Sequence, residues 1–443
     1  MLLEAVKQFV VEQEIVDRPL TVALSGGADS VAMLLLLNEL KKTLGINLSA
    51  IHVNHGLSQN ASQWMRFCRQ LCERLHVPIH CVELTIEKRS RKSLEQVARE
   101  ARYRAMGELM SSRGVLFTGH HSHDQFETFL LRLMRGAGLT GLGAMRPITD
   151  YPLADSRFIH NQVARPLLSF SKKDLVNYLI QQRQSWVEDE SNESDAFDRN
   201  FIRNNLIPLF ESRWPTASVS VEHSTEILQA DSDLLNEYLD DDLEFCVEEG
   251  FAEHRVLDLD AVELMSGNKR SALLRRFCQL RTGQALSRNA LMQLEQQMFS
   301  HNQDAQPKVK LDEYWALRFQ HRLYIVADTL LAEIESDAKA IMPNNRVELS
   351  GVLGGFCIEL KVMDETLEFE QFEIRFAHLS DKMQLNENGG SKPVKQLLKD
   401  MGCPPWWRGQ IPLVYNDGEL VAVADKYVEM DFQGKLNVEI AKK

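Results

Sequence analysis

The first half of the chain alternates short apolar runs with longer stretches in which apolar residues recur every three to four positions. The apolar runs predict buried strands at residues 19–24, 48–53, 79–84 and 115–118. The periodic stretches predict amphipathic helices at residues 29–44, 61–75, 93–110 and 124–134. Strands that alternate with helices favour a parallel sheet with helices on both faces. We therefore expect a parallel-sheet α/β domain over residues 1–214.

The pattern changes near residue 215. Residues 216–245 have the periodicity of one long helix, and helical and mixed segments continue to about residue 328. A turn-rich stretch at 343–355 then leads into short strand patterns and one basic helix, 392–401. Such changes indicate domain boundaries in a chain of 443 residues. We expect a mostly helical domain over residues 215–340 and a small α+β domain over residues 341–443.

Polar residues gather where the predicted strands end, which is the edge at which parallel sheets bind their ligands. The sequence SGGADS follows the first strand and opens the next helix. Its glycines permit a sharp turn, its serines offer hydroxyls, and the helix N-terminus attracts an anion. These features predict a phosphate-binding loop made of Ser25, Gly26, Gly27, Ala28, Asp29 and Ser30. The loop lacks the lysine of the common phosphate-binding loop.

Asp29 is the unusual member of this loop, because a carboxylate is repelled by a phosphate unless a cation lies between them. A carboxylate oxygen suits Mg²⁺, which makes Asp29 a candidate metal ligand. The alternative is that Asp29 only caps the helix N-terminus. His52 lies in the sequence HVNHGL at the end of the second strand, and we expect it at the same nucleotide-binding edge.

A second polar cluster, GHHSHDQFET at residues 119–128, follows the fourth strand and opens a helix. Asp124 and Glu127 are three apart and share one helix face, which suits a carboxylate pair for Mg²⁺ or for an amine. His121 is a candidate general base, because imidazole exchanges protons near neutral pH. A zinc site is disfavoured, because the adjacent His120 and His121 cannot face one ion from a regular helix.

Two arginines lie near the end of the predicted first domain, in the sequence RNFIRN. Arg199 and Arg203 are four apart on one helix face, and their forked guanidinium groups suit phosphate oxygens. The alternative is an ordinary surface helix. The asparagines in the same stretch are poor helix formers, which favours a functional role.

The composition is typical of a soluble globular protein, with 44% hydrophobic and 26% charged residues. The apolar run near the loop is too short to span a bilayer, and the acidic residues near Met1 do not resemble a cleavable signal. We therefore expect a cytoplasmic protein that does not bind a membrane. Seven scattered cysteines without a CxxC pair argue against a disulfide framework, and Cys68 and Cys72 share a helix face typical of core packing.

The net charge of −13 is unevenly spread along the chain. Residues 231–263 hold thirteen acidic residues and one basic residue, whereas residues 269–288 hold six basic residues and no acidic one. Residues 88–113 hold eight basic and three acidic residues. Local basic surfaces of this kind can bind a phosphate backbone despite a negative total charge. The alternative for each basic run is a solvated helix face.

Seven motifs together resemble the N-type ATP pyrophosphatases and, within them, the tRNA(Ile) lysidine synthetase family. In chain order over about the first 210 residues they are SGGADS, HVNHGL, EQVAREARYRAM, GHHSHDQFET, RGAGLTGLGAM, RPLL, and DESN with RNFIRN. Residues 395–428 also resemble the small C-terminal domain of the longer bacterial members. Each motif alone is a weak signal, but seven in the same order are specific.

The resemblance implies a ligase that joins L-lysine to C2 of the wobble cytidine in the CAU anticodon of tRNA(Ile), using ATP and Mg²⁺. ATP adenylates the C2 oxygen and releases pyrophosphate. The lysine ε-amine then displaces AMP, and the resulting lysidine reads the codon AUA instead of AUG. The last two domains would contact the tRNA, and a homodimer is compatible with the sequence.

The resemblance also implies roles for the candidate residues. The SGGADS loop and His52 would bind ATP, with Asp29 and Asp124 as the Mg²⁺ ligands. Six residues would be catalytic: Asp29, His121, Asp124, Glu127, Arg199 and Arg203. Among these, the arginines would stabilise the α-phosphate, the Asp124–Glu127 pair would orient the lysine amine, and His121 would accept a proton.

Two other functions compete with this one. A tRNA thiolation enzyme of the same superfamily needs paired cysteines or an iron–sulfur ligand set, and the sequence contains no CxxC. A tRNA-binding protein with an inactive nucleotide pocket would not need the intact loop, HDQFET and RNFIR sequences. Conversion of ATP to AMP that depends on both tRNA and lysine would separate the three functions.

Overall fold

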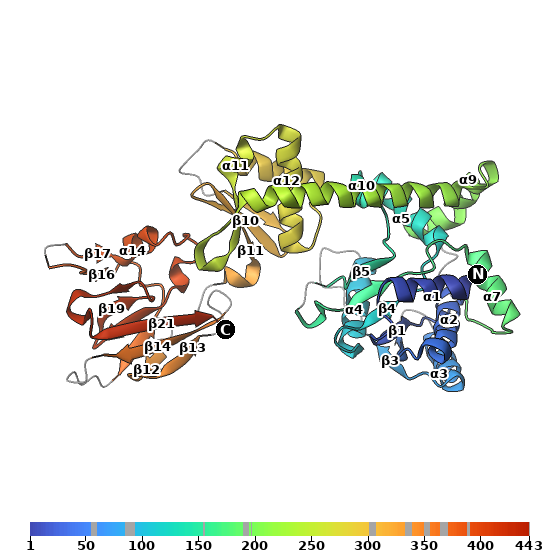
Figure 1. Cartoon of the computed structure of the whole chain (residues 1–443), viewed down its shortest axis with the longest axis horizontal. Helices are drawn as coiled ribbons and strands as arrows, with labels where there is room; N and C mark the ends of the chain where they lie inside the picture. Colours follow the sequence, from blue (N-terminus) through green and yellow to red (C-terminus); the bar gives the residue numbers. More distant parts are fainter. Residues whose placement is uncertain are drawn as a thin grey trace. The chain divides into compact units, whose positions relative to one another are not determined.

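The computed structural model describes residues 1–54, 60–84, 94–153, 156–188, 195, 197–300, 307–332, 339–349, 355–363, 371–387 and 390–442. Parts of the sequence motifs lie outside the described residues, namely HGL of HVNHGL, the basic residues 88–92 and DESN. The chain forms two compact units, Met1–Asn236 and Glu237–Lys443, and Figure 1 labels their elements. The division into three domains stays a prediction.

A six-stranded sheet forms the centre of the first unit, in the order β3-β2-β1-β4-β6-β5. Its strands are β1 Leu20–Ala23, β2 Leu48–Asn54, β3 Ile79–Glu83, β4 Val115–Phe117, β5 Ile148–Asp150 and β6 Gln162–Ala164. Every neighbouring pair is parallel except β5 and β6, which are antiparallel. The predicted parallel-sheet α/β fold is confirmed.

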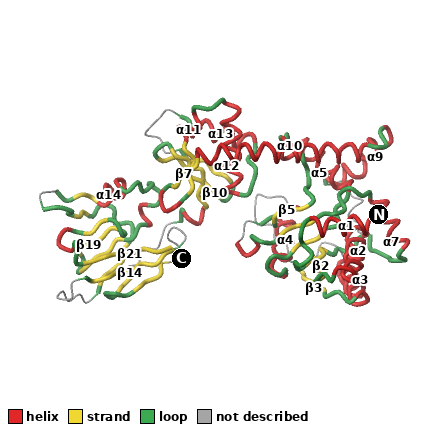
Figure 2. The backbone as a smooth tube through the Cα atoms, viewed as in Figure 1, coloured by secondary structure: helices red, strands yellow, loops and turns green. Residues whose placement is uncertain are grey.

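The helices of the first unit flank this sheet, as the red and yellow segments of Figure 2 show. They are α1 Leu2–Glu12, α2 Ala28–Leu44, α3 Ala61–Leu75, α4 Leu94–Leu109, α5 Ser122–Met134, α6 Leu139–Leu142, α7 Lys172–Gln181, α8 Asp198–Phe201, α9 Ile207–Arg213 and α10 Ala217–Cys246. Four predicted helices agree with α2, α3, α4 and α5 to within two residues. The predicted long helix agrees with α10 to within one residue.

The main core of the first unit lies between β1, β2 and β4 and the helices α1, α2, α3 and α7. Leu20 and Val22 of β1 pack against a nearly continuous apolar surface of α2. Burial of apolar side chains of this size stabilises the fold by roughly 1.5–3 kcal/mol each. Cys68 and Cys72 are fully buried in this core, which confirms their interpretation as packing residues.

The strand order creates a switch point between β1 and β4. The chain leaves β1 toward β2 on one side, whereas β4 lies on the other side of β1. The loops after β1 and after β4 therefore diverge at the same edge of the sheet, where open parallel sheets bind ligands. The helices α2 and α5 begin at these two loops.

The second unit begins with the end of α10 and contains a five-stranded antiparallel sheet, β7-β8-β11-β10-β9. Its strands are β7 Val247–Glu249, β8 Arg255–Asp258, β9 Lys308–Leu311, β10 Tyr314–Phe319 and β11 Arg322–Ala327. Three helices accompany it, α11 Leu259–Glu263, α12 Gly267–Thr282 and α13 Arg288–Met298. The region that the sequence predicts to be mostly helical, residues 215–340, therefore also contains a five-stranded sheet.

Opposite charges meet within this unit. Lys269 donates to Asp242 at 2.7 Å, and Arg276 makes a two-pronged contact with Asp240, with its Nε 2.7 Å from one carboxylate oxygen. The acidic and basic runs of the sequence therefore neutralise each other in part. Lys269 and Arg276 are consequently poorer candidates for tRNA contact than the sequence indicated.

The C-terminal part of the second unit is built from short strands and one helix. Its strands are β12 Lys339–Ile341, β13 Arg346–Leu349, β14 Phe356–Val362, β15 Phe372–Arg375, β16 Lys382–Met383, β17 Lys392–Pro393, β18 Leu413–Asn416, β19 Glu419–Val423, β20 Tyr427–Val428 and β21 Leu436–Lys442. They form sheets β12-β15-β18-β19-β20, β13-β14-β21 and β16-β17. The basic helix is α14 Val394–Asp400, and the predicted α+β architecture is confirmed.

None of the described helices is both long enough and apolar enough to cross a membrane.

Candidate active site

The SGGADS loop is held in shape by the hydroxyl of Ser30. Its Oγ accepts the backbone N–H groups of Ser25 at 3.1 Å and Gly26 at 3.2 Å, and it donates to the carbonyl of Gly27 at 3.1 Å. Gly26 has a φ of +97°, a conformation that side chains rarely adopt. The turn therefore needs glycine, and Ser30 fixes it.

Gly119 in the second loop allows close approach to the first. A Cβ atom at this position would lie 2.6 Å from both the carbonyl carbon and the oxygen of Asp29. No side chain fits there without moving the start of α2. Gly119 thus sets the spacing between the two loops, and the sequence motif alone did not indicate this role.

Asp29 does not cap the helix. The N-cap residue of α2 is Gly27, so the capping alternative is wrong. The Oδ1 atom of Asp29 is buried and has no hydrogen-bond partner among the described residues, although the side chain as a whole is 33% exposed. Burial raises the pKa of Asp29, an effect that the charge of His121 opposes and that of Asp124 reinforces. Such an unpaired carboxylate oxygen fits a cation.

His52 lies in β2 and forms a hydrogen bond with the backbone just after β1. Its Nδ1 is 2.8 Å from the carbonyl oxygen of Leu24, and the side chain is buried. Burial lowers the pKa of His52, which keeps the ring neutral near pH 7. His52 is not among the described residues that line the cavity below, so a direct contact with ATP stays a prediction.

His121 and Asp124 cap the first turn of α5 with reciprocal hydrogen bonds. The Nδ1 of His121 accepts the backbone N–H of His123 at 3.2 Å, and Asp124 Oδ2 accepts the backbone N–H of His121 at 3.0 Å. His121 Nε2 then lies 3.5 Å from Asp124 Oδ2 and 3.7 Å from Asp29 Oδ2. With Nδ1 accepting, a neutral His121 carries its proton on Nε2, between the two carboxylates.

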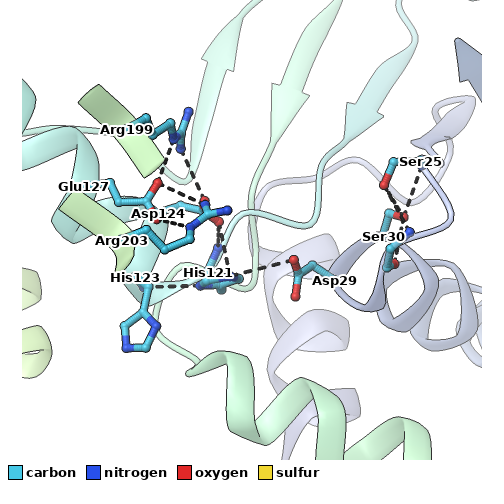
Figure 3. Close-up of polar contacts among 10 residues, drawn as sticks. Ser25, Asp29, Ser30, His121, His123, Asp124, Glu127, Arg199 and Arg203 are labelled. Atoms are coloured by element: carbon cyan, nitrogen blue, oxygen red, sulfur yellow. Dashed lines mark hydrogen bonds and ion pairs between the residues drawn. The ribbon is translucent and has the colours of Figure 1, made fainter. Parts of the chain in front are cut away.

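Two carboxylates and two arginines form a compact cluster, drawn in Figure 3. Arg199 Nε contacts Glu127 Oε2 at 2.6 Å, and Arg203 Nε contacts Glu127 Oε1 at 2.5 Å. Both arginines also donate through Nη2 to Asp124 Oδ1, at 3.2 and 3.1 Å. Glu127 is fully buried, whereas the arginine side chains are about 30% exposed. The cluster therefore satisfies its own charges.

The arginines come from an irregular helix. Residues Ile202–Leu206 form a π-turn between α8 and α9, a distortion that often marks functional sites. Arg199 precedes this turn and Arg203 lies within it, yet both side chains reach the same two carboxylates. The four-residue spacing indicated a shared face, but it did not predict the π-turn.

The surrounding groups keep Asp124 ionised. Burial by itself would raise the pKa of Asp124, but the electrostatic effects of His121, His120 and Arg199, together with the backbone N–H of His121, outweigh it and lower the pKa to about 2. His120 shows the opposite balance, because burial lowers its pKa to about 3 despite the nearby Asp124. At neutral pH the cluster therefore holds an ionised Asp124 beside a neutral His120.

One cavity of about 370 Å³ joins the two halves of the site. Its lining includes predicted residues from the loop and from the cluster, namely Ser25, Asp29, Ser30, Asp124, Arg199 and Arg203. Sequence analysis did not predict the other residues of the cavity wall, which include Arg102, Tyr103, Met106, Thr118, Gly119 and His120. Arg102, Tyr103 and Met106 belong to the EQVAREARYRAM sequence, whose helical spacing is the signal that could have identified them. His121 and Glu127 lie behind the wall, in contact with residues that form it.

A glycine–serine loop at a sheet switch point, facing arginines across a cavity, is the arrangement of a nucleotide-binding α/β enzyme. A family model described as a PP-loop domain matches residues 2–210. Two further models, described as the TilS substrate binding domain and the TilS substrate C-terminal domain, match residues 257–324 and 372–440. The first unit is a PP-loop domain of the ATP pyrophosphatase type, which is the predicted class.

Relatives extend this assignment to the whole chain. A tRNA(Ile)-lysidine synthase from Serratia proteamaculans is 34% identical and covers 93% of this chain and 92% of its own length. One from Actinobacillus pleuropneumoniae is 33% identical, with coverage of 92% and 96%. The chain belongs to the tRNA(Ile)-lysidine synthase family, so the predicted family and enzyme class are confirmed.

A solved U34-tRNA thiolase from Methanococcus maripaludis is 19% identical and covers 52% of this chain and 78% of that one, with a TM-score of 0.42.

Proposed function

We propose that the enzyme joins L-lysine to C2 of the wobble cytidine in the CAU anticodon of tRNA(Ile). The C2 oxygen of cytidine attacks the α-phosphorus of ATP, and pyrophosphate leaves. The lysine ε-amine then attacks C2, loses a proton, and expels AMP together with the original oxygen. The product is lysidine, which reads AUA instead of AUG.

The single observation that carries this proposal is the cavity shared by the loop and the arginines. In this proposal the ATP phosphates bind the N–H groups in the first turn of α2, at the end of the SGGADS loop. The loop needs no lysine because it holds a departing pyrophosphate. The other wall offers Asp124, Arg199 and Arg203, which suit an anion and an amine. A carbonyl oxygen leaves poorly unless it becomes an ester of AMP, and both steps fit between these walls.

Asp29 is the residue that would hold Mg²⁺. Its buried Oδ1 has no partner among the described residues, and a bound Mg²⁺ would neutralise charge on the pyrophosphate. Asp124 fits this role less well, because both of its oxygens already accept hydrogen bonds. Its predicted role as a second metal ligand stays a prediction.

In this proposal Arg203 contacts the α-phosphate. Its Nε and Nη2 bind Glu127 and Asp124, whereas its Nη1 makes no hydrogen bond with the described residues. Preorganised donors of this kind stabilise charge that develops in a transition state. Glu127 supports this function by holding both guanidinium groups in place, and Arg199 provides a second donor at the same wall.

The lysine amine would meet Asp124 at the cavity wall. The sequence predicts that Asp124 and Glu127 share this role, but Glu127 is fully buried and is not among the described residues that line the cavity. His121 would present its Nε2–H between Asp29 and Asp124. In this state it has no free lone pair for the lysine proton, so a role as general base would require a change in its hydrogen bonds.

The tRNA would approach from solvent with its wobble base extruded, which is easy in an anticodon loop. Basic residues of the second unit, including Lys395, Lys399 and Arg408, would contact the phosphate backbone. We place the reaction in the cytoplasm, where tRNA substrates occur. A homodimer remains part of the proposal, to be tested by sedimentation.

The test is transfer of radiolabelled lysine to a tRNA(Ile) transcript in the presence of ATP and Mg²⁺. The native chain should form acid-stable lysine–tRNA, and Asp29→Ala should abolish it. AMP formation without lysine transfer would retain the pyrophosphatase and refute the lysine ligation. Absence of both, with folded protein and bound tRNA, would favour a non-catalytic tRNA-binding protein.

A further inference from the structure

We infer that Glu211, which lies outside the cavity, is a positioning residue that orients His121 by anchoring His123. This inference rests on the proposed function for its kinetic readout, but it also has a readout in the resting enzyme. The contacts involve His123 of α5, Glu211 of α9 and Ser218 of α10, to which sequence analysis gave no role in the reaction.

The first step is the orientation of His121. Its side chain is only 4% exposed, and the N–H of His123 is the donor that its Nδ1 accepts. This hydrogen bond directs Nε2 toward Asp29 and Asp124. Any movement of the His123 backbone therefore turns or releases the His121 ring, and it can change which ring nitrogen carries the proton.

The second step is the anchoring of His123. Its Nε2 lies 3.1 Å from Glu211 Oε1, and its ring meets the His121 ring edge to face, with centroids 5.8 Å apart. Figure 3 shows the His123 side chain pointing away from the cluster of Asp124, Glu127 and the arginines. The ring thus fastens the first turn of α5 to a residue outside the site.

The third step is the position of Glu211. It belongs to α9, which continues directly from the π-turn that carries Arg203. The same Oε1 atom also accepts the hydroxyl of Ser218, at 2.6 Å, from the first turn of α10. One carboxylate oxygen therefore joins α5, α9 and α10, and it couples the position of Arg203 to that of His121.

The contact between His123 and Glu211 should matter more for the position of His121 than for the stability of the fold. The side chains of His123 and Glu211 are 29% and 32% exposed, and polar contacts with this much solvent access contribute little to stability. Loss of Glu211 should therefore reduce turnover more than it reduces folding. Because the described hydrogen bonds of Glu211 go to His123 and Ser218 and not to the SGGADS loop, the KM for ATP should change little.

The experiment measures tRNA-dependent AMP release and lysine transfer for Glu211→Ala and Glu211→Gln. We expect Glu211→Ala to lower kcat by about twofold to fivefold, because a contact this exposed cannot hold the His121 ring more strongly than its own small interaction energy allows, with the KM for ATP unchanged. Glu211→Gln keeps an oxygen acceptor for His123 and Ser218, so it should recover most of the activity. Ser218→Ala, which leaves the His123 contact intact, should have an intermediate effect.

The matched control is Asp233→Ala. Arg146 and Asp233 form a two-pronged pair at 2.7 Å, also between α10 and the catalytic unit, with side chains 34% and 53% exposed. This pair does not involve His123. An equal loss of kcat in Asp233→Ala would mean that docking of α10 matters rather than the orientation of His121, and it would overturn the inference.

The second readout is ¹⁵N NMR of histidine-labelled enzyme without substrates, with His121 assigned by its missing signal in His121→Gln. The native ring should show a protonated Nε2 and an unprotonated Nδ1, and Glu211→Ala should give a mixture of tautomers. An unchanged His121 signal in folded Glu211→Ala would refute the positioning role. If no form of the enzyme modified tRNA, the proposed function would be wrong. The ¹⁵N signal of His121 would still show whether Glu211 orients that ring.

Discussion

The two halves of the site differ in how their charges are satisfied. The SGGADS loop is a local structure, fixed by one serine and a glycine turn, and it leaves a buried oxygen of Asp29 without a partner among the described residues. The cluster of Asp124, Glu127, Arg199 and Arg203 is assembled from segments more than 70 residues apart, and its charges pair internally. The loop half therefore has a charged oxygen that a ligand can satisfy, whereas the charges of the cluster half are already paired before a ligand binds.

The loop half is therefore suited to bind a ligand, whereas the cluster half holds its side chains in position before a ligand binds. An unpaired buried carboxylate oxygen costs folding free energy unless a ligand compensates it. A paired cluster instead fixes the geometry of its arginines before substrate arrives. The same substitution of charge by an amide should therefore have opposite effects on stability in the two halves.

The largest expected effect on activity is that of Asp29→Asn. It should lower kcat by at least about 100-fold, because the loop loses the charge proposed to hold the cation. Burial raises the pKa of Asp29, so the ionised form is unfavourable in the native state. Removal of the charge should therefore leave the free energy of unfolding unchanged or slightly higher, as measured by urea titration.

The control for this prediction is Asp150→Asn, an exposed aspartate of β5 outside the cavity. It makes the same change of charge and should alter neither activity nor stability. A marked loss of stability in Asp29→Asn would mean that the carboxylate has a structural partner, and the contrast between the halves would fail.

Glu127→Gln should have the largest effect on stability. It leaves two guanidinium groups facing a buried amide, and loss of one partner from a buried pair costs about 3–5 kcal/mol. The arginine side chains are about 30% exposed, so we expect the lower end, about 3 kcal/mol, in urea unfolding. If Glu127→Gln were as stable as the native protein, the cluster would not be a preorganised unit.

Gly119→Ala tests the spacing between the halves. The added Cβ would meet the backbone of Asp29 at 2.6 Å, and overpacking of this kind costs about 1–3 kcal/mol. The shift of α2 should also raise the KM for ATP. Gly138→Ala is the control, because nothing lies within 4 Å of its Cβ; it should have the native KM and a similar unfolding midpoint.

The smallest expected effect is the pH dependence contributed by His52. Burial lowers its pKa in the native state, so below pH 6.5 the unfolded chain binds a proton that the native chain does not. Its contribution to stability is complete above the unfolded pKa and decreases as the pH falls. The difference in unfolding free energy between native and His52→Asn should shrink by at most about 1.4 kcal/mol per pH unit; a difference constant from pH 7.5 to 5.5 would contradict this.

Local features of the fold and site could be predicted from the sequence. The glycine turn, the strand ends and the helices α2 and α5 depend on neighbouring residues, and the shared faces of Asp124 with Glu127 and of Arg199 with Arg203 follow from helical spacing. Most of what could not be predicted depends on tertiary packing. The mutual pairing of the four residues, the Gly119 contact, the hydrogen bond of His52 with Leu24 and the pairing of Lys269 with Asp242 all join segments distant in sequence. The π-turn is local, but helical spacing does not reveal it.

The most direct test of the proposed reaction is mass spectrometry of the anticodon fragment of tRNA(Ile) after incubation with enzyme, ATP, Mg²⁺ and lysine. The account predicts that the wobble cytidine gains the mass of lysine less one water, with one AMP formed per base modified. A methionine tRNA with the same CAU anticodon should remain unmodified. AMP formed without that gain in mass, or lysine found on any other nucleotide, would contradict the account.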